Sequence, residues 1–355
     1  MTTIYQKYEN KGLSGLANVG NTCYLNSCMQ VLSHTYELNE FLDQSDYKKR
    51  INKIGDSVIL LEWDKLRAAL WSDNITIAPL GFVRGVQTIA NAKGRQIFSG
   101  NAQNDVQEFL LFIIDCFHNS LAREVHMQIA GTAQNDTDLL AKTCYEMIQR
   151  MYKKEFSDIF NIFFGIHISE ISALSEDNKT LSVSPEPFSV ISLSLPPLLQ
   201  TTAEPTLYDC LNYYCKPEIL SHENGNAWFN DKTKQKENVK RSIVFWSLPT
   251  ILIIDLKRWN QNNRKVHTIV RVPIHNADFS KYVKGYNANS YIYDLYGICN
   301  HSGGSLGGHY TAYIKNANGK WYEFNDTRVS EIKEENIITS HAYCFFYRKK
   351  NIMAL

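Results

Sequence analysis

The sequence predicts an α+β fold in which helices come first and an antiparallel sheet follows. Three observations support this prediction. Apolar residues recur at helical spacing from about residue 22 to residue 155. From about residue 156 onward, short alternating or continuous apolar runs of the kind found in strands dominate. Near the end of the chain, the turn sequence Asn-Ala-Asn-Gly at residues 316–319 separates two such runs, as in a β-hairpin.

Two segments carry the helical pattern most clearly, because their apolar residues fall on one face of a helix. The first contains Leu25, Cys28, Met29 and Leu32, and the second contains Val106, Phe109, Leu110, Ile113 and Phe117. Asp105 stands directly before the second segment and three residues before Glu108, which resembles a capping box. We therefore expect an amphipathic helix to begin close to residue 23 and another close to residue 106.

The strand signals lie further along the chain. Residues 189–195 alternate between polar and apolar and stop at Pro196, whereas residues 250–256 form a continuous apolar run that suits a strand buried on both faces. Further strands are expected at 310–315, 320–325 and 342–348. The polar stretches 170–186 and 222–240 are predicted to be loops or hairpin tips.

Composition excludes several classes of protein. The chain has 355 residues, of which 44% are hydrophobic, and its formal net charge is +1. A neutral chain gives no support to nucleic-acid binding. It contains no run near the ~18 apolar residues of a membrane span, and its polar start has no signal-peptide core. We expect an intracellular, cytoplasmic or nuclear monomer with no membrane association and no appended targeting domain.

One of the eight cysteines stands in a reactive setting. None of them forms a C-x-x-C pair, so neither a disulfide framework nor a zinc site is indicated. Cys23 follows Gly20, which permits a tight turn, and either Asn21 or Thr22 could cap the helix that begins there. The positive end of that helix would lower the thiol pKa, as a nucleophile requires. The alternative is a buried structural cysteine.

A thiolate that attacks a carbonyl creates an oxyanion, which needs hydrogen-bond donors already in place. The backbone N–H of Cys23 can provide one donor. The side-chain amide of Asn18, on the same loop, can provide another. The alternative is that Asn18 is an ordinary turn residue.

The candidate base is His309, which a glycine-rich loop delivers to the start of a predicted strand. Such a loop could also bind phosphate, but it lacks the Gly-Lys-Ser/Thr of a P-loop and precedes a strand. His301 is the rival base, although it would lie in the flexible loop. Either Asn325 or Asp326, across the predicted hairpin, could accept a hydrogen bond from the far nitrogen of His309.

These segments resemble the ubiquitin-specific proteases. Residues 15–27, Gly-Leu-Ala-Asn-Val-Gly-Asn-Thr-Cys-Tyr-Leu-Asn-Ser, are similar to the Cys box of that family. Residues 307–313 together with 321–326 are similar to its His box, and residues 103–110 are similar to its Gln-Gln-Asp-x-x-Glu-Phe signature. The resemblance extends from about residue 12 to residue 348.

The resemblance implies a papain-like cysteine protease fold in a thumb–fingers–palm hand arrangement. The single catalytic domain would span 12–348, with short tails at 1–11 and 349–355. Its parts would be a thumb at about 12–155, fingers at about 156–245 and a palm at about 246–348. It also implies a deubiquitinating thiol isopeptidase whose partners are ubiquitin and ubiquitinated proteins. Cleavage would follow the C-terminal glycine of ubiquitin, through an acyl-enzyme that water hydrolyses.

The family roles fall on particular residues of this chain. The resemblance implies that Cys23 is the nucleophile, His309 the general base and acid, and Asn325 the residue that orients His309. Asn18 would be the oxyanion donor, and Asp326 would assist polarisation. The residues implied to bind the extended tail of ubiquitin are Asp105, Tyr310 and Gln103.

The fingers depart from the family pattern. Many members hold them with a zinc ribbon of two C-x-x-C pairs, but residues 167–172 and 228–233 contain no cysteine here. We therefore expect fingers without a zinc ribbon, no metal and no cofactor. Two other functions remain open: a protease for a ubiquitin-like modifier such as NEDD8 or SUMO, and a ubiquitin-binding scaffold without catalysis. A Cys23–His309 ion pair predicts a bell-shaped dependence of rate on pH.

Overall fold

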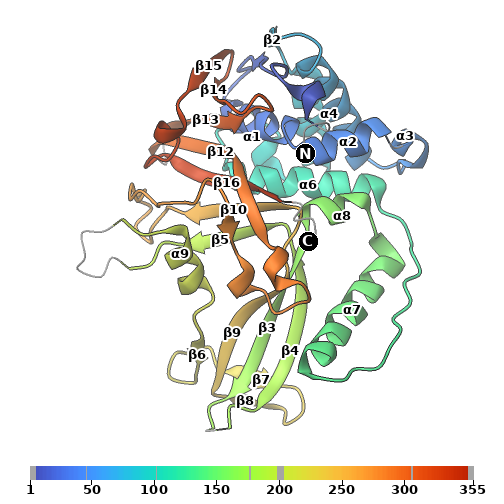
Figure 1. Cartoon of the computed structure of the whole chain (residues 1–355), viewed down its shortest axis with the longest axis vertical. Helices are drawn as coiled ribbons and strands as arrows, with labels where there is room; N and C mark the ends of the chain where they lie inside the picture. The colour runs from blue at the N-terminus through green and yellow to red at the C-terminus, as the bar shows by residue number, and fades with distance from the viewer. Residues whose placement is uncertain are drawn as a thin grey trace.

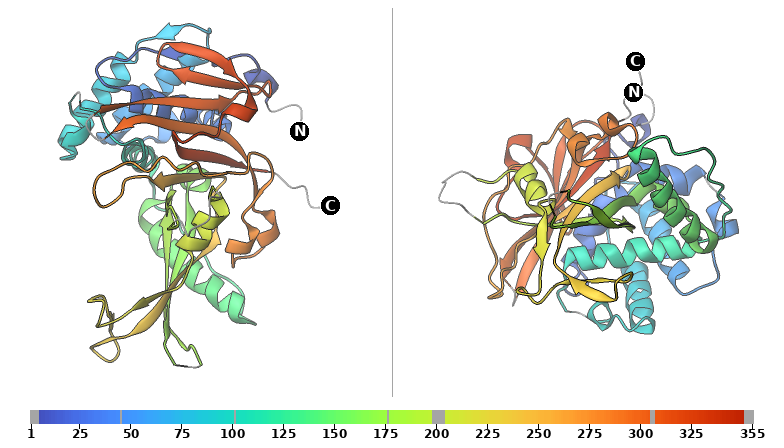
Figure 2. Two further views of the ribbon diagram at one scale, coloured as in Figure 1. Left: turned by 90° about the vertical axis from the view of Figure 1, so that its left-hand side faces the viewer. Right: turned by 90° about the horizontal axis from the view of Figure 1, so that it is seen from below.

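The computed structural model describes residues 5–44, 46–100, 102–175, 177–197, 204–304 and 307–350. Helices from the first part of the chain pack against a large twisted sheet from the last part (Figure 1). A second sheet extends from this body, at the lower end of the molecule in Figure 1 and in the left view of Figure 2. The predicted α+β class is therefore confirmed.

The helical side of the body is built around α1. Its helices are α1 (Cys23–Ser33), α2 (Tyr36–Gln44), α3 (Tyr47–Arg50), α4 (Asp56–Leu70), α5 (Leu80–Ala92) and α6 (Val106–Leu121). The short strands β1 (Gly15–Leu16) and β2 (Thr76–Ile77) pair in parallel beside them. Every residue of α1 is buried, because the helix lies between the large sheet and the other helices. The predicted helix starts near residues 23 and 106 are confirmed.

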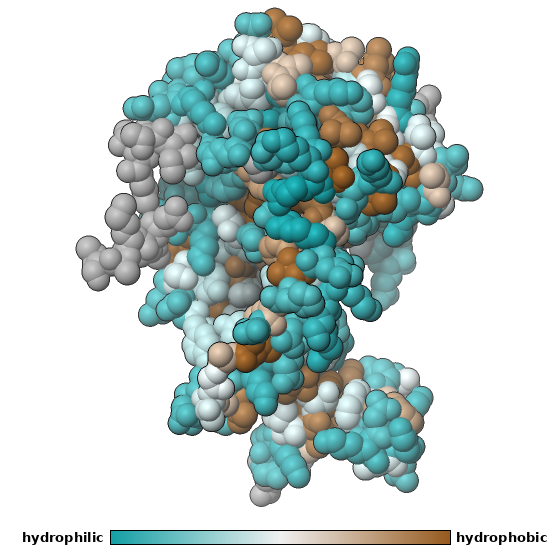
Figure 3. Space-filling view, turned by 90° about the vertical axis from the view of Figure 1, so that its right-hand side faces the viewer, coloured by the Kyte–Doolittle hydropathy of each residue, from teal (hydrophilic) through white to brown (hydrophobic). Residues whose placement is uncertain are grey.

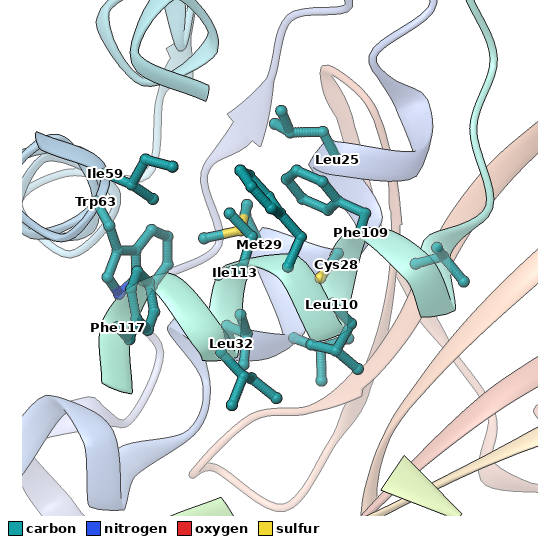
Figure 4. Packing of buried hydrophobic residues seen from close by; sticks show 14 of the residues in the cluster. Leu25, Cys28, Met29, Leu32, Ile59, Trp63, Phe109, Leu110, Ile113 and Phe117 are labelled. Atoms are coloured by element: carbon teal, nitrogen blue, oxygen red, sulfur yellow. The ribbon is translucent and has the colours of Figure 1, made fainter. Parts of the chain in front are cut away.

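The apolar faces predicted from the sequence meet in one core. Figure 4 shows Leu25, Cys28, Met29 and Leu32 of α1 close to Phe109, Leu110, Ile113 and Phe117 of α6, with Ile59 and Trp63 of α4 beside them. Each large side chain fully buried in this way stabilises the fold by about 1.5–3 kcal/mol relative to exposure. The core therefore fixes the position and direction of α1, which carries Cys23 at its first residue.

The large sheet has the strand order β15-β14-β13-β12-β16-β10-β5, with β11 paired to β12 beside this path. Its strands are β5 (Val190–Ser194), β10 (Ile251–Lys257), β11 (Ala277–Asp278), β12 (Ile292–Gly304), β13 (Gly307–Lys315), β14 (Trp321–Asn325), β15 (Arg328–Ile332) and β16 (Ala342–Lys349). Its ladders are antiparallel except for that of β10 with β5. The predicted hairpin at residues 316–319 joins β13 to β14, and β10 is buried on both faces, as expected.

The second sheet has the order β4-β3-β9-β6, and a separate β7–β8 hairpin lies beyond it. The strands are β3 (Gly165–Ala173), β4 (Thr180–Phe188), β6 (Glu218–Leu220), β7 (Trp228–Asn230), β8 (Gln235–Glu237) and β9 (Val239–Ser247). The polar stretch 170–186 is therefore mostly strand, because β3 and β4 form one long hairpin. No group of three or more His, Cys, Asp or Glu side chains that could hold a metal occurs among the described residues.

Three further α-helices follow along the chain, and two of them fall where strands were expected. They are α7 (Asp136–Glu155), α8 (Asp158–Phe163) and α9 (Leu207–Tyr214). The start of α9 carries a full capping box between Thr206 and Asp209, a signal that the sequence does contain. In α7, Ala141, Cys144 and Ile148 pack against Ile168 of β3 and Trp246 of β9.

On the face shown in Figure 3, hydrophilic residues predominate and hydrophobic residues lie in small groups among them. Within the described ranges, none of the helices has the length and apolar character needed to cross a lipid bilayer.

Candidate active site

Cys23 is placed by a tight loop in front of α1. Gly20 and Asn21 both adopt left-handed backbone conformations, with φ of 117° and 55°. Thr22 occupies the N-cap position, but its hydroxyl makes no cap bond and instead accepts from the backbone N–H of Val19, at 3.0 Å. Of the two predicted N-cap residues the structure therefore has Thr22 in that position, without the side-chain bond of a typical cap. The side-chain oxygen of Asn18 accepts from the backbone N–H of Thr22, at 3.0 Å, and closes the loop.

The thiol of Cys23 is nearly inaccessible, since the residue is 1% exposed. Burial raises its pKa above the ordinary value, and the Asp326 carboxylate also raises it, while a hydrogen bond from the backbone N–H of Tyr310 acts in the opposite direction. The lowered pKa predicted from the helix terminus is therefore wrong for this arrangement. The cost of burying a thiolate outweighs the favourable N–H groups, which favours the protonated form of Cys23.

His309 lies on β13, directly before the residue whose N–H contacts the sulfur of Cys23. Its Nε2 is 2.8 Å from the side-chain oxygen of Asn325 on β14. An amide oxygen can only accept, so Nε2 carries the proton and Nδ1 is left as the basic nitrogen. The fold thus brings together groups from near the two ends of the chain.

Asp326 binds asparagines of the Cys23 region. It occupies the turn between β14 and β15 with a left-handed φ of 49°. Its carboxylate accepts from the side-chain nitrogens of Asn18, at 3.1 Å, and Asn26, at 2.8 Å. Its backbone oxygen accepts from Leu16 N, at 2.9 Å. These contacts tie the turn to the loop and helix that carry Cys23. Sequence reasoning did not single out Asn26, and the spacing of 300 residues gives no local signal for the contact.

His301, the rival base, is held in β12 and is 5% exposed. Lys265 Nζ lies 2.9 Å from its Nδ1, which must then accept the bond. Burial, together with the nearby cationic Lys265, lowers the pKa of His301 to about 4. The expectation that His301 lies in a flexible loop is therefore wrong.

Asp105 and Tyr310 meet at the start of α6. Asp105 is the N-cap, but its carboxylate accepts from the N–H of Gln107, at 2.8 Å, so the expected capping box with Glu108 is replaced by a single cap bond. Tyr343 donates to the same carboxylate, at 2.5 Å. The hydroxyl of Tyr310 lies at the backbone N–H of Val106, and burial raises its pKa.

Gln103 lies in the segment before α6 and contacts the start of β13. Its Nε2 donates to the backbone oxygen of Gly308, at 2.5 Å, and its Oε1 accepts from the backbone N–H of Gly308, at 2.7 Å. Both polar atoms of the side chain therefore bind the residue directly before His309.

One acidic residue near this site was not selected from the sequence. Asp255 is 5% exposed in β10, and burial raises its pKa to about 6, with a further contribution from the negative charge of Asp105. Ser192 donates to its carboxylate, at 2.5 Å. A single acid within the apolar run 250–256 was the available signal.

Comparisons with known proteins agree with this geometry. A family model described as "Ubiquitin carboxyl-terminal hydrolase" matches residues 14–347. The chain is 33% identical over 347 residues to "Ubiquitin carboxyl-terminal hydrolase Usp2" of Drosophila melanogaster, covering 96% of this chain and 35% of that protein. It is 32% identical over 346 residues to "Ubiquitin carboxyl-terminal hydrolase 2" of Homo sapiens, covering 95% and 55%. The chain thus spans about a third to about half of these relatives.

A solved structure gives the same fold. The chain matches "Structure of the SAGA Ubp8/Sgf11/Sus1/Sgf73 DUB module bound to ubiquitin aldehyde" with a TM-score of 0.71 and 25% identity, covering 98% of this chain and 71% of that one. The predicted fold class, a papain-like hand, is therefore confirmed. With a family model matched over nearly its whole length, the chain belongs to the ubiquitin carboxyl-terminal hydrolase family.

Proposed function

We propose that the chain is a deubiquitinating thiol isopeptidase that cleaves after the C-terminal glycine of ubiquitin. The observation that carries the proposal is the position of the Cys23 sulfur at the N–H of Tyr310, beside a His309 whose far nitrogen is bound to Asn325. Acyl transfer by a thiol needs a nucleophile, a base beside it and a group that orients the base.

The proposed reaction has two stages. His309 Nδ1 takes the proton of the Cys23 thiol while the sulfur bonds to the glycine carbonyl carbon. The resulting imidazolium then protonates the departing lysine or α-amine nitrogen, which leaves an acyl-enzyme. Water attacks the thioester, His309 accepts its proton, and return of that proton to the sulfur regenerates the thiol. Because the resting thiol has a raised pKa, proton removal belongs to the attack itself.

The remaining roles follow from the contacts. Asn325 would fix the tautomer of His309, and Asn18, together with the N–H of Cys23, would stabilise the oxyanion. Asp326 would act by holding Asn18. Asp105 and Tyr310 would bind the tail of ubiquitin, whose arginines favour a carboxylate.

Ubiquitin is the proposed partner because the relatives are named ubiquitin hydrolases and the similar structure is described as bound to ubiquitin aldehyde. The boundaries of thumb, fingers and palm, the monomeric state and the cytoplasmic location remain predictions.

Covalent labelling tests the proposal. Ubiquitin-propargylamide should add one ubiquitin to the wild-type chain at Cys23, and Cys23→Ala should abolish the adduct. Parallel labelling with NEDD8 and SUMO probes tests which modifier the chain accepts. If only one of those two probes labelled the chain, that modifier and not ubiquitin would be the substrate. Ubiquitin binding without labelling or turnover would instead support the scaffold function.

A further inference from the structure

Gln103 makes two hydrogen bonds to Gly308. A residue that only bound the tail of ubiquitin would not need them. Nε2 donates to the carbonyl oxygen of Gly308 at 2.5 Å, and Oε1 accepts from the N–H of the same residue at 2.7 Å, so both polar atoms are occupied by the chain itself. A side-chain amide that donates to and accepts from the same residue behaves like a paired residue of a neighbouring strand. Gln103 therefore holds the backbone at Gly308.

The start of β13 has little other support on this side. Its ladder with β14 begins at the pair Ala312–Phe324, beyond His309. On its opposite side it pairs with β12, where His309 faces Ser302. Peptide groups alternate in direction along a strand, so the N–H groups of residues 308 and 310 point the same way. One meets Gln103 and the other meets the sulfur of Cys23.

The ring of His301 lies close against Gly308. A Cβ added to Gly308 would lie 2.2 Å from Nε2 of that ring and 2.6 Å from the backbone oxygen of Ser302. The residue is thus confined between β12 and the Gln103 amide. Its carbonyl carbon is bonded to the nitrogen of His309, so a shift of Gly308 shifts the base as well.

We propose that Gln103 is a positioning residue, which sets the placement of His309 relative to Cys23 by fixing the backbone of Gly308. This inference rests on the proposed thiol chemistry. It replaces the tail-binding role of Gln103 with a positioning role that needs no bound ubiquitin. Gln103 is exposed and is therefore not part of the core, although it fixes the backbone next to His309. Its loss should change the chemical step while leaving the fold intact.

Kinetic measurements distinguish a role of Gln103 in positioning His309 from a role in binding the tail of ubiquitin. Gln103→Met removes both bonds at similar length, and Gln103→Glu keeps only the acceptor. With ubiquitin-rhodamine, we expect Gln103→Met to lower kcat roughly 10- to 100-fold, because small displacements of a catalytic group have effects of that size. KM should stay within about twofold. Gln103→Glu should also lower kcat, because its second carboxylate oxygen would face the Gly308 carbonyl oxygen, and two acceptors cannot bond to each other. Gln149→Met is the matched control, since it also loses a glutamine-to-backbone bond, to Met127 O at 2.8 Å, but on α7.

A second measurement needs no ubiquitin. Mass spectrometry gives the rate at which iodoacetamide alkylates Cys23 as a function of pH, with His309→Ala as the reference for a displaced base. Gln103→Met should move the profile toward that of His309→Ala. A raised KM with unchanged kcat, or unchanged kinetics and an unchanged alkylation profile, would overturn the positioning role. If wild type neither reacts with nor hydrolyses ubiquitin probes, the proposed function fails, and the alkylation profiles alone decide the role of Gln103.

Discussion

Replacing Asp326 with asparagine separates its structural and electrostatic effects. The carboxylate accepts from two side-chain nitrogens, of Asn18 at 3.1 Å and of Asn26 at 2.8 Å. An asparagine at 326 has one oxygen, so keeping the shorter bond to Asn26 turns its own N–H₂ toward Asn18. Two donors then face each other, and Asn18 loses its anchor.

The size of the effect follows from the bond that is lost. A hydrogen bond to a charged group contributes about 1.5–3 kcal/mol. If that free energy holds Asn18 in place for the transition state, kcat should fall roughly 10- to 100-fold, since about 1.4 kcal/mol is tenfold in rate. Removing the donor itself, in Asn18→Ala, should cost about 10²- to 10³-fold. The pKa of the Cys23 thiol should fall in Asp326→Asn, because the negative charge of Asp326 that raises it is removed.

A double-mutant cycle checks this reasoning. We would measure kcat on ubiquitin-rhodamine for Asp326→Asn, Asn18→Ala and the double variant, and the pH at which iodoacetamide alkylates Cys23. Asp177→Asn is a matched control, because its carboxylate also accepts bonds within an exposed turn. The double variant should be no slower than Asn18→Ala, and alkylation of Asp326→Asn should begin at lower pH. Multiplicative losses in kcat, or an alkylation profile shifted to higher pH, would refute the argument.

Three further outcomes are expected. Asp255→Asn should raise the free energy of unfolding at pH 8 by up to about 3 kcal/mol, because a buried carboxyl with a pKa near 6 opposes folding once ionised, while asparagine can still accept from Ser192; urea titration measures this. His301 has a folded pKa of about 4, below its unfolded value of about 6.5, so the unfolded chain binds more protons and stability falls as pH drops through that window. From pH 7 to pH 5 the wild type should therefore lose about 2 kcal/mol more stability than His301→Gln, in which the similar contribution of buried His34 remains. Gly15→Ala should lower both the melting temperature and kcat, because its Cβ would lie 2.3 Å from the backbone oxygen of Thr327, beside the Asp326 turn; unchanged values would mean that the turn can move freely.

The sequence predicts local features of this site better than long-range ones. The start of α1 at Cys23 and the β13–β14 hairpin follow from nearby apolar spacing and turn residues, and both are present. The contact of Asp326 with Asn26 joins residues 300 positions apart, and no pattern within either segment indicates it. The raised pKa of Cys23 was mispredicted for the same reason. The helix terminus is visible in the sequence, but the burial that outweighs it depends on the packed fold.

The second sheet and Cys23 pack through different clusters of the core. The cluster that contains Cys23 also contains Ala312 and Ile314 of β13 and Phe324 of β14, so one packed interface fixes α1 against the strand that carries His309. The β3–β9 pair packs with α7 through a separate cluster that includes Trp246, and Phe245 of β9 joins a third cluster with strands of the large sheet. In the described part of the chain, the cluster that contains Cys23 includes no residue of the cysteine-free stretches 167–172 and 228–233. The absence of cysteines from these stretches is therefore compatible with the placement of Cys23 at the start of α1 and of His309 on β13.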